Sequence, residues 1–368
     1  MATAAPVTTP QIALLFQRPT RKMLDAQAFV PGGNDLRFEL DQNGYLDMLR
    51  VNLTGSYAAA NTITITKQQL VHAIVKKFLL DVPNRETPIN ISGSAMRVFN
   101  LRNNDFGTFP ADPVPPNRTG AEANALYATK EDVFPITENV TNDFSLNWII
   151  PFHRSVVDHK GALPVGGLPK LYFTVTPCNS LADFLTTTNG VATDLSDFAA
   201  VMTVEQVSYS APPADANVIP GTKGAGYVVK YDEQIDVIEA AGVAQRVNID
   251  PTDIILAIEH QVTIDGVLDG VDVDRLYFKV AESYFTDPNG IPSWQKTMDD
   301  AAEHGAPFPE GTFMWDGDLP STGAAGWIHT DGINKIEAGI TVKTGTTLGS
   351  IANIRTAVCR LIDLTAGA

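Results

Sequence analysis

The chain has 368 residues, with 26 Lys or Arg against 42 Asp or Glu, so its formal net charge is −16. This charge argues against a protein whose main work is to bind nucleic acid phosphates, and two cysteines exclude a disulfide scaffold. Hydrophobic residues make up 44% of the chain, which excludes general disorder, and only 18% of residues are charged. So few charges indicate a surface that is uncharged and polar, or one that partners largely cover.

Residues 1–30 are predicted to form an N-terminal arm. The first ten residues lack the basic and apolar regions of a secretory signal, and no stretch approaches the ~20 apolar residues that span a bilayer. The segment Gln11–Phe29 combines apolar and basic residues, and Pro19 limits it to a short helix on each side. Such a segment could lie along an anionic lipid surface, or pack on a neighbouring subunit or its own domain.

Strand patterns dominate residues 31–210, which we predict to form a first domain. Leu36–Leu40 and Leu49–Thr54 alternate apolar and polar residues, and the turn-forming segment Asp41–Gly44 lies between them. Further strands are predicted at Thr62–Thr66, Met96–Leu101, Phe144–Ile150, Leu171–Val175 and Val201–Ser208.

Helices and one long loop are expected to interrupt these strands. In Gln68–Leu80 apolar residues recur near the 3.6-residue period, which predicts a packed helix or, alternatively, a strand-rich connection. A further helix is expected around Ser180–Leu185. Phe106–Thr119 contains four prolines and is therefore predicted to be a loop.

A Pro- and Gly-rich stretch, residues 211–226, is predicted to link the first domain to a second one at residues 227–368. The chain before Ser210 has 16 basic and 19 acidic residues, whereas the rest has 10 basic and 23 acidic ones, so most of the negative charge lies in the second domain. Strands of that domain are predicted at Tyr227–Tyr231, Ile254–Ile264, Arg275–Tyr284, Gly311–Trp315, Lys335–Lys343 and Thr356–Leu364.

The second domain is predicted to contain one helix, Pro292–Glu303. Ser293 can cap its start, Trp294 and Met298 form an apolar i, i+4 pair, and Gly305 ends it. Each half is thus β-rich and interrupted by few helices, which suits two β-sandwich domains of about eight strands.

No motif for catalysis or nucleotide binding is present. The phosphate-binding loop, the dinucleotide fingerprint, the nucleophile elbow and the His-Glu-x-x-His pair all have fixed spacings, and none occurs. His153 and His159, with Asp158 beside them, could serve acid–base or metal chemistry, but a polar loop between strands is the ordinary interpretation. We therefore expect no catalytic residue, no cofactor site, no metal site and no enzymatic activity.

The acidic run Asp265–Asp274 is the best candidate for binding a cation. Its oxygen-rich side chains and glycines could wrap calcium, but the spacing differs from that of an EF-hand, and a solvated turn needs no metal. Asp316-Gly317-Asp318 is a similar, weaker case. Cys178 and Cys359 lie in strand-like segments and are expected to be buried free thiols.

The predicted segments follow one another in an order that is similar to that of a known protein family. Phe38–Gly55 forms an opening strand pair, Asn142–His153 and Lys170–Thr176 flank a Gly/Pro-rich excursion, and Pro309–Asp318 precedes the last strands. This order resembles that of the double jelly-roll major capsid proteins of tailless icosahedral, often membrane-containing viruses. Their lineage includes tectivirus-like phages and adenovirus.

The resemblance implies an all-β chain with two eight-stranded jelly-roll β-sandwiches in tandem and a few short helices in the connecting loops. It implies homotrimers, each a near-hexagonal capsomer, that are synthesised in the host cytoplasm and build an icosahedral virion shell. The implied partners are neighbouring capsomers, minor capsid and penton proteins, and an internal membrane met through the N-terminal arm. Sequence-specific binding of nucleic acid is not expected.

Two other functions stay open at this point. A carbohydrate-binding or carbohydrate-active β-sandwich would gather aromatic and acidic residues along one groove, whereas Trp148, Trp294, Trp315 and Trp327 are dispersed in the sequence. A viral spike or fibre-anchoring protein would show a repetitive shaft, and the sequence contains none.

Overall fold

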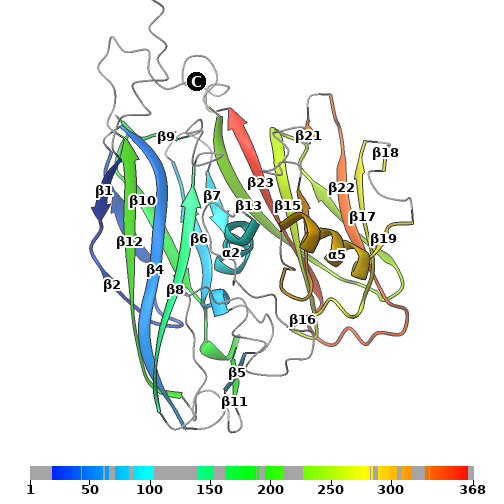
Figure 1. Cartoon of the computed structure of the whole chain (residues 1–368), viewed down its shortest axis with the longest axis horizontal. Helices are drawn as coiled ribbons and strands as arrows, with labels where there is room; N and C mark the ends of the chain where they lie inside the picture. Colours follow the sequence, from blue (N-terminus) through cyan, green and yellow to red (C-terminus); the bar gives the residue numbers. More distant parts are fainter. Residues whose placement is uncertain are drawn as a thin grey trace, which may run out of the picture.

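The computed structural model of the chain consists mostly of β-strands (Figure 1). It describes residues 19–42, 44–60, 63–65, 71–82, 87–102, 140–152, 162–166, 168–183, 185–187, 189, 195–209, 227–281, 283–284, 289–304, 308–316, 328–330 and 332–363. Within these ranges no helix combines the length and apolar character needed to cross a membrane.

The first sandwich packs two layers of four strands face to face. One layer has the strand order β1-β12-β4-β8 and the other β3-β10-β6-β7. The strands of the first layer are β1 (Thr20–Met23), β12 (Leu195–Tyr209), β4 (Tyr45–Ala59) and β8 (Thr141–Pro151). Those of the second are β3 (Leu36–Leu40), β10 (Leu171–Pro177), β6 (Val75–Leu80) and β7 (Ile89–Ile91).

Shorter elements complete the first sandwich. Strand β2 (Gln27–Phe29) pairs with β12, β9 (Leu163–Pro164) pairs with β4, and β5 (Ile63–Ile65) pairs with β11 (Leu185–Thr187). The helical elements are the 3-10 helices η1 (Val71–Ile74) and η3 (Leu181–Asp183) and the α-helix α2 (Gly93–Arg102).

The second sandwich repeats the plan of four strands in each layer. Its first layer has the order β13-β23-β15-β16, with β20 and β21 also paired to β15, and its second layer has the order β14-β22-β17-β18. The first layer consists of β13 (Tyr227–Val237), β23 (Asn353–Asp363), β15 (Ile254–Ile264), β16 (Val267–Leu268), β20 (Thr312–Asp316) and β21 (Ile328–His329). The second consists of β14 (Ala244–Ile249), β22 (Ile336–Val342), β17 (Val273–Val280), β18 (Ser283–Tyr284) and β19 (Ile291–Pro292), with helix α5 (Ser293–His304) beside it.

A single sheet joins the two sandwiches. Strand β7 pairs in parallel with β13, with Ile89 opposite Tyr231 and Asn90 opposite Asp232, so one layer of each sandwich belongs to the same ten-stranded sheet. Figure 1 shows β13 and β23 running from this junction into the second sandwich.

The alternation of side chains along this sheet gives the protein two hydrophobic cores. Trp148, whose ring meets that of Phe78 edge-on at 5.4 Å, lies in the first core, which also takes in Tyr231 and Leu361 from the second sandwich. The opposite face of β15 and β23 contributes to the second core, together with the layer that contains β22. Because neighbouring residues of a strand point to opposite faces, one layer serves both cores.

The structure confirms the all-β fold class with two eight-stranded sandwiches, and strands occupy most of the predicted positions. The predicted linker 211–226 and the proline-rich loop Phe106–Thr119 lie outside the described residues. The boundaries proposed for the two domains therefore stay a prediction.

The predicted strand Met96–Leu101 is wrong, because these residues belong to helix α2. Ser92 caps this helix, since its Oγ accepts the N–H of Ala95 at 3.3 Å and its carbonyl accepts the N–H of Met96 at 3.0 Å. The helix is buried on every side. It therefore lacks the polar face that makes a surface helix recognisable in a sequence.

Two other helix predictions also need correction. Within Gln68–Leu80, Val71–Ile74 is a 3-10 helix and Val75–Leu80 is strand β6, so the alternative of a strand-rich connection was the better one. After Pro19 the chain forms strands β1 and β2, not a short helix, because both pair with β12 and the side chain of Phe29 enters the core.

Gly55 is required by the close packing of β4 against β12. It lies opposite Ala200, next to a shift in the register of the two strands. A Cβ at this position would clash with the carbonyl oxygen of Ala199 and lie 2.8 Å from the Cα of Ala200.

We expect Gly55→Ala to destabilise the protein by about 1–3 kcal/mol, the usual cost of forcing atoms into a packed interior. Gly166→Ala is the control, because the nearest heavy atoms to a Cβ there are 3.8 Å away. Urea unfolding followed by tryptophan fluorescence measures both variants. Equal stability of the two variants would contradict the packing argument.

Candidate functional site

Helix α2 occupies the junction between the two sandwiches (Figure 1). All ten of its residues are buried, and it contacts β6 and β8 of the first sandwich and β15 of the second. The ring of Phe99 lies 5.6 Å from that of Tyr231 in β13. The indole Nε1 of Trp148 donates to the carbonyl of Gly93 at 2.8 Å. The helix therefore belongs to the first core, at the place where that core takes in residues of the second sandwich.

A polar side chain of α2 forms hydrogen bonds with backbone groups that no neighbouring strand pairs with. Asn100 uses both ends of its amide, because its Nδ2 donates to the carbonyl of Ile149 at 2.5 Å and its Oδ1 accepts the N–H of Ile149 at 3.0 Å. Ile149 lies in β8, the last strand of its layer, so a side chain replaces the missing neighbouring strand there.

A buried ion pair connects α2 to the second sandwich. Arg102 Nε donates to Asp316 Oδ2 at 2.6 Å and Arg102 Nη2 donates to Asp316 Oδ1 at 2.8 Å, which is a bidentate pairing. The two side chains are 4% and 0% exposed. A pair this deeply buried holds the halves in one geometry, because either charge alone would be costly to bury.

A second polar network lies where α2 begins. Glu233 of β13 accepts the N–H of Ser92 at 2.5 Å and forms an ion pair with Arg355 Nε at 2.7 Å. Arg355 Nη1 also donates to Ser94 Oγ at 3.0 Å. The start of the helix is thus fixed to β13 and β23 of the second sandwich.

Glu259 is a fully buried carboxyl group beside this network. Its Oε1 accepts from Gln261 Nε2 at 2.6 Å, and its Oε2 has no hydrogen-bond partner within the described part of the chain. Burial raises the pKa of Glu259 well above its usual value, and the charge of Glu233 raises it further, while Gln261 and Arg355 oppose the rise. Burial therefore favours the protonated, neutral form of Glu259 in the folded protein.

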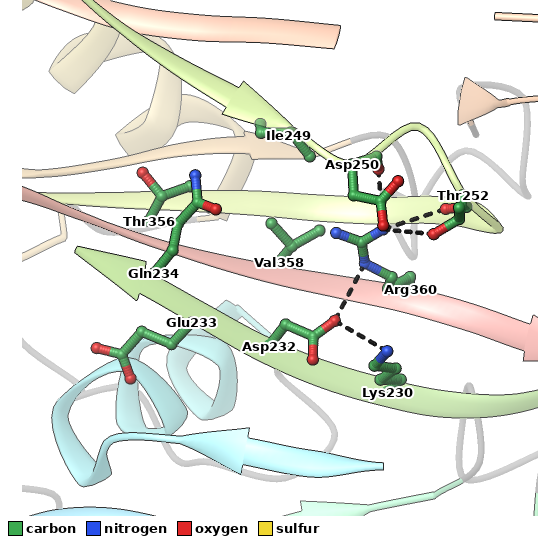
Figure 2. Close-up of a pocket in the computed structure, with 10 residues that line it drawn as sticks. All are labelled: Lys230, Asp232, Glu233, Gln234, Ile249, Asp250, Thr252, Thr356, Val358 and Arg360. Carbon is green, nitrogen blue, oxygen red and sulfur yellow. Dashed lines mark hydrogen bonds and ion pairs between the residues drawn. The ribbon is translucent and has the colours of Figure 1, made fainter. Parts of the chain in front are cut away.

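A polar pocket of about 200 Å³ opens on the second sandwich (Figure 2). Arg360 Nη1 donates to the carbonyls of Asp250 and Thr252 at 3.0 and 3.1 Å, and Asp232 Oδ2 lies 3.4 Å from Arg360 Nε and from Lys230 Nζ. The lining residues are Lys230, Asp232, Glu233, Gln234, Ile249, Asp250, Thr252, Thr356, Val358 and Arg360. This lining has no Ser, Cys or His to serve as nucleophile or base, and its main charges pair with each other.

Helix α5 lies where the sequence predicts it, but its apolar pair points to solvent and its polar face points inward. Trp294 and Met298 are 64% and 65% exposed, whereas Lys296, Asp300 and His304 are buried. Ser293, predicted to cap the helix, instead donates its hydroxyl to the carbonyl of Val273 at 2.6 Å.

The inward face of α5 is a cluster of ionisable groups. Lys296 pairs with Asp300, which also accepts the N–H of Met314 at 3.2 Å. Burial raises the pKa of Asp300 to about 6, against the opposing effect of Lys296. Burial lowers the pKa of His304 to about 4, and the carboxylate of Asp316 only partly offsets this.

The other candidate residues do not converge on one site. His153 and His159 lie outside the described residues, as do Gly317 and Asp318. Both cysteines are buried and neither forms a disulfide, as predicted. Of the tryptophans, Trp148 is in the core, Trp294 is exposed on α5 and Trp315 stacks on Phe278, while Trp327 lies outside the described residues.

The acidic run Asp265–Asp274 serves as turn structure. Asp265 and Gly266 have φ angles of 51° and 79° and form the two-residue turn between β15 and β16. Asp269 Oδ1 accepts the N–H of Asp272 at 2.8 Å, which closes a second turn. In the described part of the chain, the one group of three residues that could hold a metal ion lies elsewhere, at Asp300, Glu303 and His304.

Two tandem sandwiches with four strands in each layer define the double jelly-roll fold, which viral major capsid proteins share. The fold that the sequence resemblance implied is thereby confirmed. No family model matches the chain, and no curated protein matches it.

Solved structures carry this likeness across almost the whole chain. The major capsid protein of Sulfolobus turreted icosahedral virus has a TM-score of 0.65 and 14% identity, covering 94% of this chain and 97% of that one. The capsid of virus PBCV-1 has a TM-score of 0.58 and 8% identity, covering 94% of each chain. The major capsid protein P2 of bacteriophage PM2 has a TM-score of 0.53 and 8% identity, covering 94% and 98%.

We expect Arg102→Met to destabilise the protein by about 3–5 kcal/mol, because it leaves the carboxylate of Asp316 buried without its partner. The double variant Arg102→Met/Asp316→Leu removes both charges and should recover most of this loss. Lys170→Met, which breaks the exposed pair with Glu39, is the control and should leave the unfolding midpoint unchanged. Denaturant unfolding of the four proteins gives the comparison. Equal loss in the single and double variants would contradict it.

Glu259 should make the protein less stable as the pH rises. Above the ordinary glutamate pKa of 4.5 the unfolded chain releases this proton while the folded chain keeps it, so the free energy of unfolding falls with rising pH. Glu259→Gln has no proton to lose. We expect it to be more stable than the wild type at pH 8, with a difference that shrinks toward pH 4, in thermal unfolding measured across this range. Parallel pH curves for the two proteins would contradict the assignment.

Proposed function

We propose that the chain is a major capsid protein that self-assembles as homotrimers into the icosahedral shell of a virion. The observation that carries the proposal is the double jelly-roll fold, built as one body by the ten-stranded sheet and the buried helix α2. Three such chains supply six similar sandwiches, which suits a near-hexagonal tile.

The composition fits this function. Only 18% of the residues are charged, and a protein that neighbours surround on all sides needs broad, uncharged contact surfaces. The isolated exposed apolar side chains, such as Val237 at 67% and Val271 at 65%, are available for such contacts.

Within this function we propose the division into a first roll at residues 31–210, a linker at 211–226 and a second roll at 227–368. Residues 1–30 act as an arm whose second part, β1 and β2, joins the first roll. Its apolar residues before Pro19, together with Arg18, are available to contact an internal membrane or a neighbouring subunit. Minor capsid and penton proteins are the further partners.

The chemistry of the described residues supports a structural role without enzymatic activity. In the polar pocket, Asp232, Lys230 and Arg360 are held in ion pairs with one another, and the ionisable groups at the junction hold the two halves together. The tryptophans form no stacking platform for sugars in the described part of the chain, since Trp148 is in the core and Trp315 packs on Phe278.

We expect the purified full-length protein to have a mass three times the 39.6 kDa of one chain in light scattering, with near-hexagonal particles in negative-stain images. Raising the protein concentration should produce sheets or shells of these particles. A monomer that persists at high concentration, with a normal unfolding transition, would overturn the proposal.

A further inference from the structure

Helix α5 buries its ionisable residues and exposes its apolar ones. The inward residues Lys296, Asp300 and His304 follow each other at intervals of four, so they form one stripe along the helix. Burying such groups costs free energy unless each of them finds a partner. Each residue of this inward stripe should therefore have a charged or hydrogen-bonding partner.

Lys296 and Asp300 form an ion pair with each other, whereas His304 has no hydrogen-bonded partner of this kind among the described residues. Its side chain is only 2% exposed, and its Nε2 has no hydrogen-bond partner within the described residues. The nearest carboxylate oxygens are Glu303 Oε2 at 4.0 Å and Asp316 Oδ2 at 3.9 Å. These distances are too long for hydrogen bonds.

The 4.0 Å between His304 Nε2 and Glu303 Oε2 is within about 0.6 Å of the distance between two ligands of one metal ion. Zinc binds nitrogen and oxygen at about 2.0–2.2 Å, so two ligands at a tetrahedral angle lie about 3.4 Å apart. Ligand atoms of Asp300, Glu303 and His304 all lie within 4.8 Å of one another. The spacing i, i+3, i+4 holds the three side chains together on one helix face before any metal arrives.

We propose that His304, Glu303 and Asp300 bind a divalent transition-metal ion of the zinc class. His304 Nε2 and one oxygen of each carboxylate are the ligands, and water completes the coordination. Asp316, held by Arg102, is not a ligand but places a negative charge 3.9 Å from the imidazole. No metal site is expected from the sequence, so this assignment comes from the three-dimensional arrangement.

The cations of the cluster do not prevent metal binding. Lys296 must leave Asp300, and the face of the Trp315 ring, already 4.8 Å from its Nζ, offers it another position. Three carboxylates, those of Asp300, Glu303 and Asp316, outnumber the two cations Lys296 and Arg102, so a divalent ion enters a site of net negative charge.

The test uses the full-length protein, stripped of metal with EDTA and titrated with Zn²⁺ in a calorimeter. The visible absorption spectrum of bound Co²⁺ then shows how the ion is coordinated. We expect one saturable site per chain. Glu303→Gln should weaken the affinity tenfold or more, because it removes a charged ligand from a side chain that is 39% exposed and tolerates the change. Glu310→Gln, a glutamate outside the cluster, is the matched control and should bind as the wild type does.

A third variant separates metal binding from a purely structural role. Lys296→Met removes the ammonium that competes for Asp300, so it should strengthen Zn²⁺ binding, which a structural ion pair alone would not predict. The proposal is overturned if neither Zn²⁺ nor Co²⁺ shows saturable binding, or if Glu303→Gln and Glu310→Gln bind alike. Because binding is measured per chain, this result does not depend on whether the protein assembles.

Discussion

The polar side chains of helix α2 can find partners only inside the protein, because all ten residues of the helix are buried. Asn100 satisfies the backbone of β8, and Arg102 pairs with Asp316 of β20 in the other half. The network of Glu233 and Arg355 holds the start of the helix. Rotating one sandwich against the other would break several of these contacts at once, so the junction behaves as one packed interior and not as a hinge.

The sequence predicts most strands because alternation along a strand is a local signal. That signal is clear where one face is buried, as in Leu36–Leu40, whose residues are alternately buried and exposed. It fails for Met96–Leu101, since a helix buried on all sides shows neither the period of a surface helix nor that of a strand. Trp294 and Met298 mark α5 correctly as a helix, but residue type alone does not reveal that its buried face is the one that carries Lys296, Asp300 and His304.

The candidate sites are less predictable because their residues meet only in the folded chain. Arg102 and Asp316 are 214 residues apart in sequence, and nothing local marks either as half of an ion pair. The acidic run Asp265–Asp274 stands out in the sequence, yet it forms turns. Asp300, Glu303 and His304 have a visible helical spacing, but that spacing becomes meaningful only once the structure shows His304 facing inward.

The parallel pairing of β7 with β13 also affects how copies of the chain meet. A free strand edge is a template on which another chain can add a strand, and such additions lead to aggregation. The pairing covers the edges of β7 and β13 at two residues of each strand, and Asn100 covers part of the edge of β8. Where these edges are covered, another copy of the chain cannot add a strand, so a contact between copies at these positions would be made by side chains and could be broken and remade more easily.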